Sequence, residues 1–353
     1  MGLEMVTTDT ETTRVDAAPL LEVKDLKKHF PIQRGLLRRT VGQVRAVDGV
    51  SFTIGKGQTY GLVGESGSGK TTTGRMLMRA IEPTAGEIWF QDSALGRVNV
   101  ADLDTGRLRQ IRRNMKIIYQ DPYSSLNPRM TVLQVVGEHL LVNKLMRGKE
   151  LEGRVAELLQ LVGLRPEYMH RYPHAFSGGQ RQRLAIARAL SMQPQLIVCD
   201  EPVSALDVSV QAQILKLLHG LQRQFGLSYL FVAHDLSVVE NVSDRVSVMY
   251  VGKIVETAST KELYRHPLHP YTEALLSAVP RPDPKAKKKR IILQGEAPSP
   301  ANPPTGCHFH PRCPYVQDVC KVDEPPLREV KPNHFAACHF SEELDLKGAV
   351  GAE

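Results

Sequence analysis

The feature that most constrains the fold is a glycine-rich segment between an apolar run and a stretch of helical periodicity. Residues 64–71 read GESGSGKT, and residues 61–63 before them read GLV. After the segment, Met76, Leu77 and Ala80 recur at helical spacing. Glycines at this position let backbone N–H groups turn inward around phosphate oxygens, and the positive end of a following helix points at the same anion. The segment therefore predicts a strand, a phosphate-binding loop and a helix.

Two residues of this loop carry the chemistry of a nucleotide site. We expect Lys70 to reach the β and γ phosphates and Thr71 to offer its hydroxyl to Mg²⁺. The predicted nucleotide-binding residues are Gly64, Glu65, Ser66, Gly67, Ser68, Gly69, Lys70, Thr71 and Thr72. By average residue usage, this spacing of glycines, lysine and threonine arises by chance in roughly one chain in a hundred of this length. The loop alone predicts a bound nucleoside triphosphate and leaves its reaction open.

Two carboxylates and a histidine follow further apolar runs. Asp200 and Glu201 come directly after residues 196–199, LIVC, at the carboxyl end of a predicted strand, where open α/β sheets bind ligands. We expect Asp200 to hold Mg²⁺ and Glu201 to orient or deprotonate the attacking water. His234 ends the run at residues 229–233 and is placed to donate to the γ-phosphate. A surface Asp-Glu pair and a structural histidine are the alternatives.

A second motif lies upstream of these carboxylates. Residues 176–183 read FSGGQRQR, and a Ser-Gly-Gly-Gln string is rare by chance. Together with the loop at Gly64, it resembles the signature of ATP-binding cassette (ABC) proteins. In that family two cassettes face each other head to tail. The resemblance therefore implies that the signature residues contact the ATP of a partner subunit; these residues are Ser177, Gly178, Gly179 and Gln180, together with Asp207 from the stretch SALD.

The same resemblance assigns roles to further residues, because they match other motifs of the family. Gln120 resembles the Q-loop glutamine, which implies a contact with Mg²⁺ beside Thr71 and Asp200. His234 resembles the switch histidine, and with Glu201 it would form the catalytic pair. Phe30 resembles the aromatic residue that stacks on adenine, although a core phenylalanine on a strand is the equal alternative.

Other stretches resemble the ATPases of dipeptide and oligopeptide importers. They are residues 119–129, YQDPYSSLNPR, residues 171–174, RYPH, residues 266–272, HPLHPYT, and residues 306–314, GCHFHPRCP. The match spans about residues 20–340 and is nearest to the DppF/OppF-type subunit of that family. It implies one half of a heterodimeric ATPase that drives peptide import through two integral-membrane permeases. An extracytoplasmic binding protein would feed them, and the ATPase would lie peripherally on the cytoplasmic face of the inner or plasma membrane.

Four of the five cysteines gather in one segment: Cys307, Cys313, Cys320 and Cys338. Four thiolates suit either a [4Fe–4S] cluster or tetrahedral zinc. The gaps are wider than those common in zinc fingers, which favours iron and sulfur, and the family resemblance points the same way. Zinc is the second expectation, with His308, His310 or His334 as substitute ligands, and free thiols are the third.

The resemblance implies a P-loop NTPase of the α/β class, with a RecA-like core, an antiparallel β subdomain and a helical subdomain. A small Cys-containing extension would follow. The expected divisions are a flexible tail at 1–18, the ABC nucleotide-binding domain at 19–268 with its helical subdomain at about 121–190, the C-terminal extension with a four-Cys metal site at 269–345, and a tail at 346–353.

Composition limits the remaining functions. The chain has 353 residues, enough for one large and one smaller domain. Its longest apolar runs fall far below the roughly 20 residues that a membrane span needs, and its start resembles no secretory signal. The formal charge of +7 is concentrated in local stretches such as residues 285–290, so we expect no nucleic-acid partner. A cassette of DNA repair or translation and a regulatory nucleotide-binding module remain the competing hypotheses.

Overall fold

The computed structural model describes residues 18–35, 39–279 and 290–349. Residues 1–17 and 350–353 of the two expected tails lie outside these ranges, as do residues 285–289 of the basic stretch.

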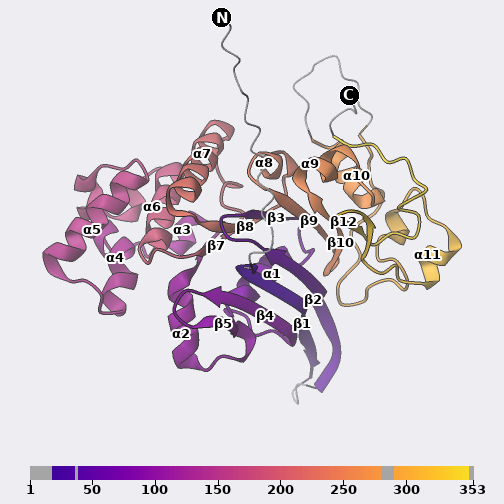
Figure 1. Cartoon of the computed structure of the whole chain (residues 1–353), viewed down its shortest axis with the longest axis horizontal. Coiled ribbons are helices and arrows are strands. Elements are labelled where there is room, and N and C mark those ends of the chain that lie inside the picture. The colour runs from indigo at the N-terminus through magenta and orange to yellow at the C-terminus, as the bar shows by residue number, and fades with distance from the viewer. Residues whose placement is uncertain (1–17, 36–38, 280–289, 350–353) are drawn as a thin grey trace, which may run out of the picture.

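An eight-stranded mixed sheet runs through the middle of the molecule (Figure 1). Its strand order is β11-β12-β10-β9-β3-β8-β7-β6. The parallel strands are β3 (Thr59–Val63), β6 (Met115–Ile118), β7 (Leu196–Asp200), β8 (Ser228–Ala233) and β9 (Arg245–Tyr250). β3, β7 and β8 are buried along their whole length, as expected for parallel strands with near-continuous apolar sequences. The strand predicted before the glycine-rich loop and the strand predicted before the carboxylates are confirmed.

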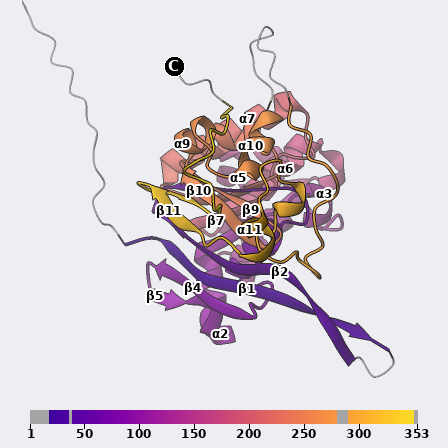
Figure 2. The same cartoon turned by 90° about the vertical axis from the view of Figure 1, so that its right-hand side faces the viewer.

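A four-stranded antiparallel sheet lies below the main sheet (Figure 2). Its order is β2-β1-β4-β5, with β1 at Leu21–Arg34, β2 at Arg39–Ile54, β4 at Ala85–Asp92 and β5 at Gly96–Asn99. One core joins this sheet to α1 (Lys70–Leu77) and to one face of the main sheet. Successive strand residues point to opposite faces, so Leu62 lies in this core while Val63 lies in the core on the other face.

The other face of the main sheet carries most of the helices. The helical stretch predicted between Pro122 and Leu190 contains α3 (Pro122–Ser125), α4 (Val132–Val142), α5 (Gly148–Leu161) and α6 (Gly178–Leu190), with 3₁₀ turns at Pro166–His170 and Pro173–Ala175. α4 and α6 begin with capping boxes, Thr131 with Gln134 and Ser177 with Gln180. Figure 1 places this group at one end of the molecule, beyond β7 and α7 (Val208–Phe225).

The remaining helices are short. They are α2 (Thr105–Asn114), α8 (Leu236–Glu240), α9 (Thr260–Arg265), α10 (Pro270–Ser277) and α11 (Asp318–Val322), with 3₁₀ turns at Val100–Asp102 and His310–Arg312. Among the helices of the described ranges, none combines the length and apolar character that crossing a membrane requires.

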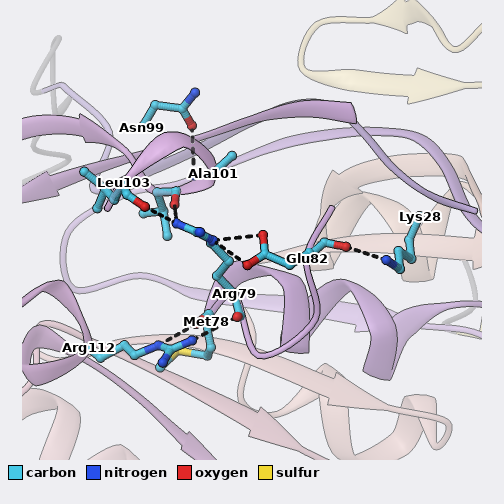
Figure 3. A network of polar contacts seen from close by, with 9 residues as sticks. Lys28, Met78, Arg79, Glu82, Asn99, Ala101, Leu103 and Arg112 are labelled. Carbon is cyan, nitrogen blue, oxygen red and sulfur yellow. Dashed lines mark hydrogen bonds and ion pairs between the residues drawn. The ribbon is translucent and has the colours of Figure 1, made fainter. Parts of the chain in front are cut away.

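Two arginines hold the C-terminal end of α1 (Figure 3). Arg112 of α2 donates to the carbonyl oxygens of Met78 at 3.0 Å and of Arg79 at 2.9 Å. Arg79, with φ at 48°, donates through Nε to both Glu82 carboxylate oxygens at 3.0 and 2.9 Å, and it also binds the Leu103 carbonyl. Carbonyls just beyond a helix end lack intrahelical partners, and cations suit the helix's negative end. These contacts fix α1 against α2 and thereby anchor the helix that follows the glycine-rich loop.

The C-terminal segment extends the main sheet, which the sequence did not predict. β10 (Lys253–Ser259) forms an antiparallel hairpin with β9, and β12 (His334–Ala336) then pairs with β10, followed by β11 (Arg328–Lys331). A buried carboxylate holds the C-terminal segment against β10. Glu256 is fully buried and accepts hydrogen bonds from the backbone N–H groups of Leu268 at 2.7 Å and His269 at 3.0 Å. His334 Nε2 lies 2.8 Å from the same carboxylate.

We expect Glu256→Ala to destabilise the chain by about 3 kcal/mol, because it leaves two buried N–H groups and a buried histidine without a hydrogen-bond acceptor. The free energy of unfolding in urea would measure this loss. Glu262→Ala is the matched control, since its carboxylate is half exposed and pairs with His266, four residues along the chain. Equal free energies of unfolding in the two variants would show that the buried contacts of Glu256 do not hold the C-terminal segment in place.

Candidate functional site

Two glycines of the loop touch neighbouring backbone so closely that no side chain fits. Gly64 has φ at 151°, and a Cβ there would lie 2.2 Å from the Met249 carbonyl oxygen. Gly69 has φ at 107°, and a Cβ there would lie 2.2 Å from the Ala46 carbonyl oxygen. The loop therefore packs tightly against β9 at Gly64 and against β2 at Gly69, and its path requires glycine at both positions.

Lys70 opens α1 and is folded back into the loop. Its Nζ donates to the carbonyl oxygens of Gly64 at 2.7 Å and Glu65 at 2.8 Å and to Ser68 Oγ at 3.2 Å. Burial lowers the pKa of the Lys70 ammonium to about 8, although nearby carboxylates oppose the shift. An anionic ligand at the loop would therefore meet a desolvated cation, where Coulomb attraction is stronger than in water.

Hard oxygen donors lie at the carboxyl end of β7. Asp200 is buried, and its Oδ1 accepts a hydrogen bond from Thr71 Oγ1 at 2.8 Å. Burial raises the pKa of Asp200, and the hydroxyl of Thr71 opposes this rise. A hydroxyl and a carboxylate in contact are a donor set that fits Mg²⁺. The structure thus brings together Thr71 and Asp200 as the sequence predicts, 129 residues apart along the chain.

Glu201 is held by residues from two other elements. Gln120 Nε2 donates to its Oε2 at 2.8 Å, and His234 Nδ1 lies 3.0 Å from the same oxygen. Glu201 adopts φ at 48°, the left-handed region that is strained for residues other than glycine. Its backbone N–H donates to the Val232 carbonyl at 2.9 Å, which fixes this conformation beside β8. Gln120, predicted to contact Mg²⁺, therefore forms one contact group with Glu201 and His234, which are predicted to act on the attacking water and the γ-phosphate.

A pocket of about 780 Å³ joins the loop to this group, which is within the size range of small-molecule sites. Of the predicted residues, it is lined by Phe30, Glu65, Ser66, Gly67, Gly69, Lys70, Thr71, Thr72, Gln120, Glu201 and His234. Phe30 is 37% exposed and so is no core residue. The sequence analysis missed Val44, Ala46, Leu275 and Pro300, which also line it. No local motif marks them, because apolar residues and prolines occur throughout the chain.

The signature residues lie elsewhere. Ser177 is exposed and caps α6, where its hydroxyl accepts a hydrogen bond from the Gln180 N–H at 3.3 Å. Asp207 is exposed at the start of α7. Within the described residues, the lining of the loop's own pocket includes none of the predicted signature residues.

Comparison with known proteins identifies the family. A model of the ABC transporter family matches residues 47–204, and a model of the C-terminal region of oligopeptide/dipeptide transporters matches residues 255–320. The oligopeptide transport ATP-binding protein AppF of Bacillus subtilis is 51% identical over 331 residues, which cover 93% of this chain and 99% of AppF. This chain belongs to the ABC transporter ATPases.

Two further comparisons agree with this family. The putative oligopeptide transport ATP-binding protein YkfD of Bacillus subtilis is 50% identical, covering 94% of this ABC ATPase and 98% of YkfD. Among solved structures, the ATP-binding cassette MJ0796, described as a dimer in a post-hydrolysis state bound to ADP and Pi, superposes with a TM-score of 0.59 at 28% identity. The match covers 68% of this chain and 98% of MJ0796. The P-loop fold of this ABC ATPase is confirmed.

The expected [4Fe–4S] cluster is wrong, and the zinc alternative has no support. In the part of the chain that the structure describes, no three His, Cys, Asp or Glu side chains converge as metal ligands. Without a metal, burial raises the pKa of Cys313 to about 12 and of Cys338 to about 11, and it raises the pKa of Cys307, so these groups are neutral thiols. His334, a suggested substitute ligand, is committed to Glu256.

The expected heterodimer is also corrected. MJ0796 is described as a dimeric ABC transporter cassette, and the relatives are named as individual ATP-binding proteins. A two-fold axis lets two identical chains present the same surface to each other. None of these comparisons names a different second ATPase.

We expect the ATP affinity of this ABC ATPase to fall as pH rises above about 8, because Lys70 is then neutral and must take up a proton to bind phosphate. The loss would approach about tenfold per pH unit. Fluorescent-nucleotide titrations between pH 7 and 9.5 would measure it. Lys70→Met should bind weakly at every pH, without this slope.

Lys116 provides the control for this pH dependence. Burial lowers its pKa to about 8 as well, but it lies outside the nucleotide pocket. Lys116→Met should therefore keep the wild-type slope. A slope that vanishes in Lys116→Met, or that persists in Lys70→Met, would contradict the assignment to Lys70.

Proposed function

We propose that this chain is the ATP-hydrolysing subunit of an importer for di- or oligopeptides. The observation that carries the proposal is the match of residues 255–320 to the C-terminal region of oligopeptide/dipeptide transporters, alongside the cassette match at residues 47–204. AppF and YkfD bear oligopeptide transport names, and the chain spans nearly their whole length. The presence of both matched regions in one chain distinguishes it from cassettes that act on DNA or ribosomes.

Lys70 and Glu201 have different roles in hydrolysis: the first binds phosphate and the second activates water. Lys70 and backbone amides of the glycine-rich loop bind the β and γ phosphates. Mg²⁺, when bound through Thr71, Asp200 and Gln120, supplies positive charge that neutralises the phosphate oxygens. Glu201 accepts a proton from the attacking water, because its carboxylate lies at the end of β7 with one oxygen held by Gln120 and His234. His234 keeps that carboxylate oriented and donates to the γ-phosphate.

A second cassette would complete each site. Ser177 and the N-terminal amides of α6 form an exposed anion-binding end that lies outside its own pocket. Val208, beside Asp207, is 81% exposed, so the start of α7 is open to a second chain. We propose that ATP binds between Lys70 of one copy and Ser177 of the other, and that ATP closes the dimer while hydrolysis opens it.

The transport partners follow from the same proposal. The dimer would sit peripherally on the cytoplasmic face of the cell membrane against two integral-membrane permeases, with an extracytoplasmic protein delivering the peptide. The nucleotide-binding domain would cover residues 19–268, with a helical subdomain at about 121–190, and an oligopeptide-transporter-type region would cover 269–345. Phe30 supports the proposed adenine end of the site, since its ring is partly exposed in the pocket.

Glu201→Gln should retain ATP binding and lower the hydrolysis rate at least about tenfold, because the amide cannot accept the proton from water. Phosphate release and nucleotide binding would be measured on the same preparation. Glu157→Gln makes the same chemical change on the exposed side of α5 and should hydrolyse like the wild type. Undiminished turnover in Glu201→Gln would remove Glu201 from its proposed role.

The transport proposal predicts that the full chain purifies from membranes together with two hydrophobic permeases. In vesicles that contain this complex, peptide and its binding protein should raise ATP hydrolysis several-fold. DNA and ribosomes should leave the rate unchanged. Stimulation by either of these instead, with no membrane partner, would overturn peptide import and favour the soluble-cassette hypothesis.

A further inference from the structure

Glu65 places a carboxylate in the phosphate-binding loop itself. It follows Gly64, lines the nucleotide pocket, and keeps 32% of its side chain exposed. A free carboxylate at this position would repel a triphosphate, and more strongly than in water because the site is partly desolvated. The loop therefore needs a partner for this charge if it is to bind ATP tightly.

Arg312 supplies that partner from the far end of the chain. Its Nη1 lies 2.7 Å from Glu65 Oε2 and its Nη2 lies 3.2 Å from Oε1, so the guanidinium and the carboxylate meet through two parallel hydrogen bonds. This paired geometry is the strongest form of an arginine–carboxylate contact. Only 8% of the Arg312 side chain is exposed, so solvent and salt screen the pair less than a surface ion pair.

Aromatic packing fixes the position of Arg312. Phe309, three residues earlier, is buried among three rings: Tyr250 at 5.3 Å, Tyr271 at 5.4 Å and His269 at 5.7 Å between centroids. The 3₁₀ turn at His310–Arg312 then carries the guanidinium from this anchor to the loop, and Arg312 Nη1 also donates to the Tyr250 hydroxyl at 3.3 Å. The arginine is thus held in place before any ligand arrives.

A second contact reaches the loop from the same part of the chain. The backbone N–H of Glu65 donates to the Tyr271 hydroxyl at 2.8 Å. Leu275 and Pro300 line the nucleotide pocket, and the Pro300 carbonyl accepts a hydrogen bond from Arg45 of β2 at 2.9 Å. The backbone and the side chain of Glu65 are therefore both held by residues that follow β10.

We propose that Arg312 is a positioning residue of the ATP site: it neutralises the Glu65 carboxylate and holds it away from the phosphates. The inference rests on the proposed function, since it assumes that ATP occupies the loop. With this role of Arg312, the C-terminal segment is part of the nucleotide site and sets the affinity of the site for ATP. The charge on Glu65 is the quantity that Arg312 controls, and this distinguishes it from a residue that only stabilises the fold.

Four full-length variants test the proposal: Arg312→Ala, Arg312→Lys, Glu65→Gln and the double variant Arg312→Ala/Glu65→Gln. Arg312→Ala should raise both the Kd and the KM for ATP about tenfold, while kcat changes by less than about twofold. High salt should shrink this defect, because it screens the freed carboxylate. Arg312→Lys keeps the charge without the paired geometry and should fall between Arg312→Ala and the wild type.

The double variant gives the decisive result. Removing the Glu65 charge should restore most of the ATP affinity that Arg312→Ala loses, because no carboxylate then faces the phosphates. Arg328→Ala is the matched control, since Arg328 belongs to the same segment but pairs with Glu342 far from the loop. It should bind ATP like the wild type.

Three outcomes would overturn the proposal: wild-type affinity in Arg312→Ala, no recovery in the double variant, or a loss in Arg328→Ala equal to that in Arg312→Ala. If Arg312→Ala does not fold, the comparison of Arg312→Lys with Arg312→Lys/Glu65→Gln decides by the same recovery. A wild-type chain that binds no ATP would instead refute the nucleotide site itself, so the two failures are distinguishable.

Discussion

Parallel pairing of β3, β8 and β7 is the constraint on which the site depends. The register sets Val63 beside Ala233 and Asp200 beside Val232, so the three strands end together at one edge of the sheet. The next residue of each strand then starts a functional segment: the loop at Gly64, the carboxylate Glu201 and the histidine at 234. Because backbone hydrogen bonds fix this register, a small number of buried apolar residues position groups that are far apart in the sequence. The contacts of α1 with Arg112 and of the loop glycines with β2 and β9 add to this arrangement and do not replace it.

The part of the site that the sequence predicted is the part encoded locally. An apolar run followed by a polar residue marks a strand end, which is why Asp200, Glu201 and His234 were found. Spacing within one loop likewise identified Lys70 and Thr71. The contacts between these groups, such as the one between Gln120 and Glu201, could be predicted only from the family resemblance or seen in the fold. Arg312 could not be found in this way, since 247 residues separate it from Glu65 and nothing in its neighbourhood signals an ion pair.

The C-terminal segment shows where composition misleads. Four cysteines in a short stretch predicted a metal, yet among the described residues no three potential ligands converge. Burial raises the pKa of three of these thiols, and as neutral groups they pack as small apolar side chains. The segment is stabilised by other means: its strand β12 pairs with β10, Glu256 binds two backbone amides, and Phe309 fills a cluster of rings. The pairing of β12 with β10 joins residues about 80 positions apart, such as Glu256 and Ala336, and a strand as short as β12 leaves almost no local pattern.

The contact between Glu65 and Arg312 also orders events in time. A ribosome makes the phosphate loop early, together with the strand before it and the helix after it. The loop then remains without the partners of its own carboxylate and backbone amide until Tyr271, Phe309 and Arg312 have been synthesised and packed. A nascent cassette therefore carries an unbalanced negative charge at its phosphate site for most of its synthesis. Completion of the chain and completion of the ATP site are, in this fold, nearly the same event.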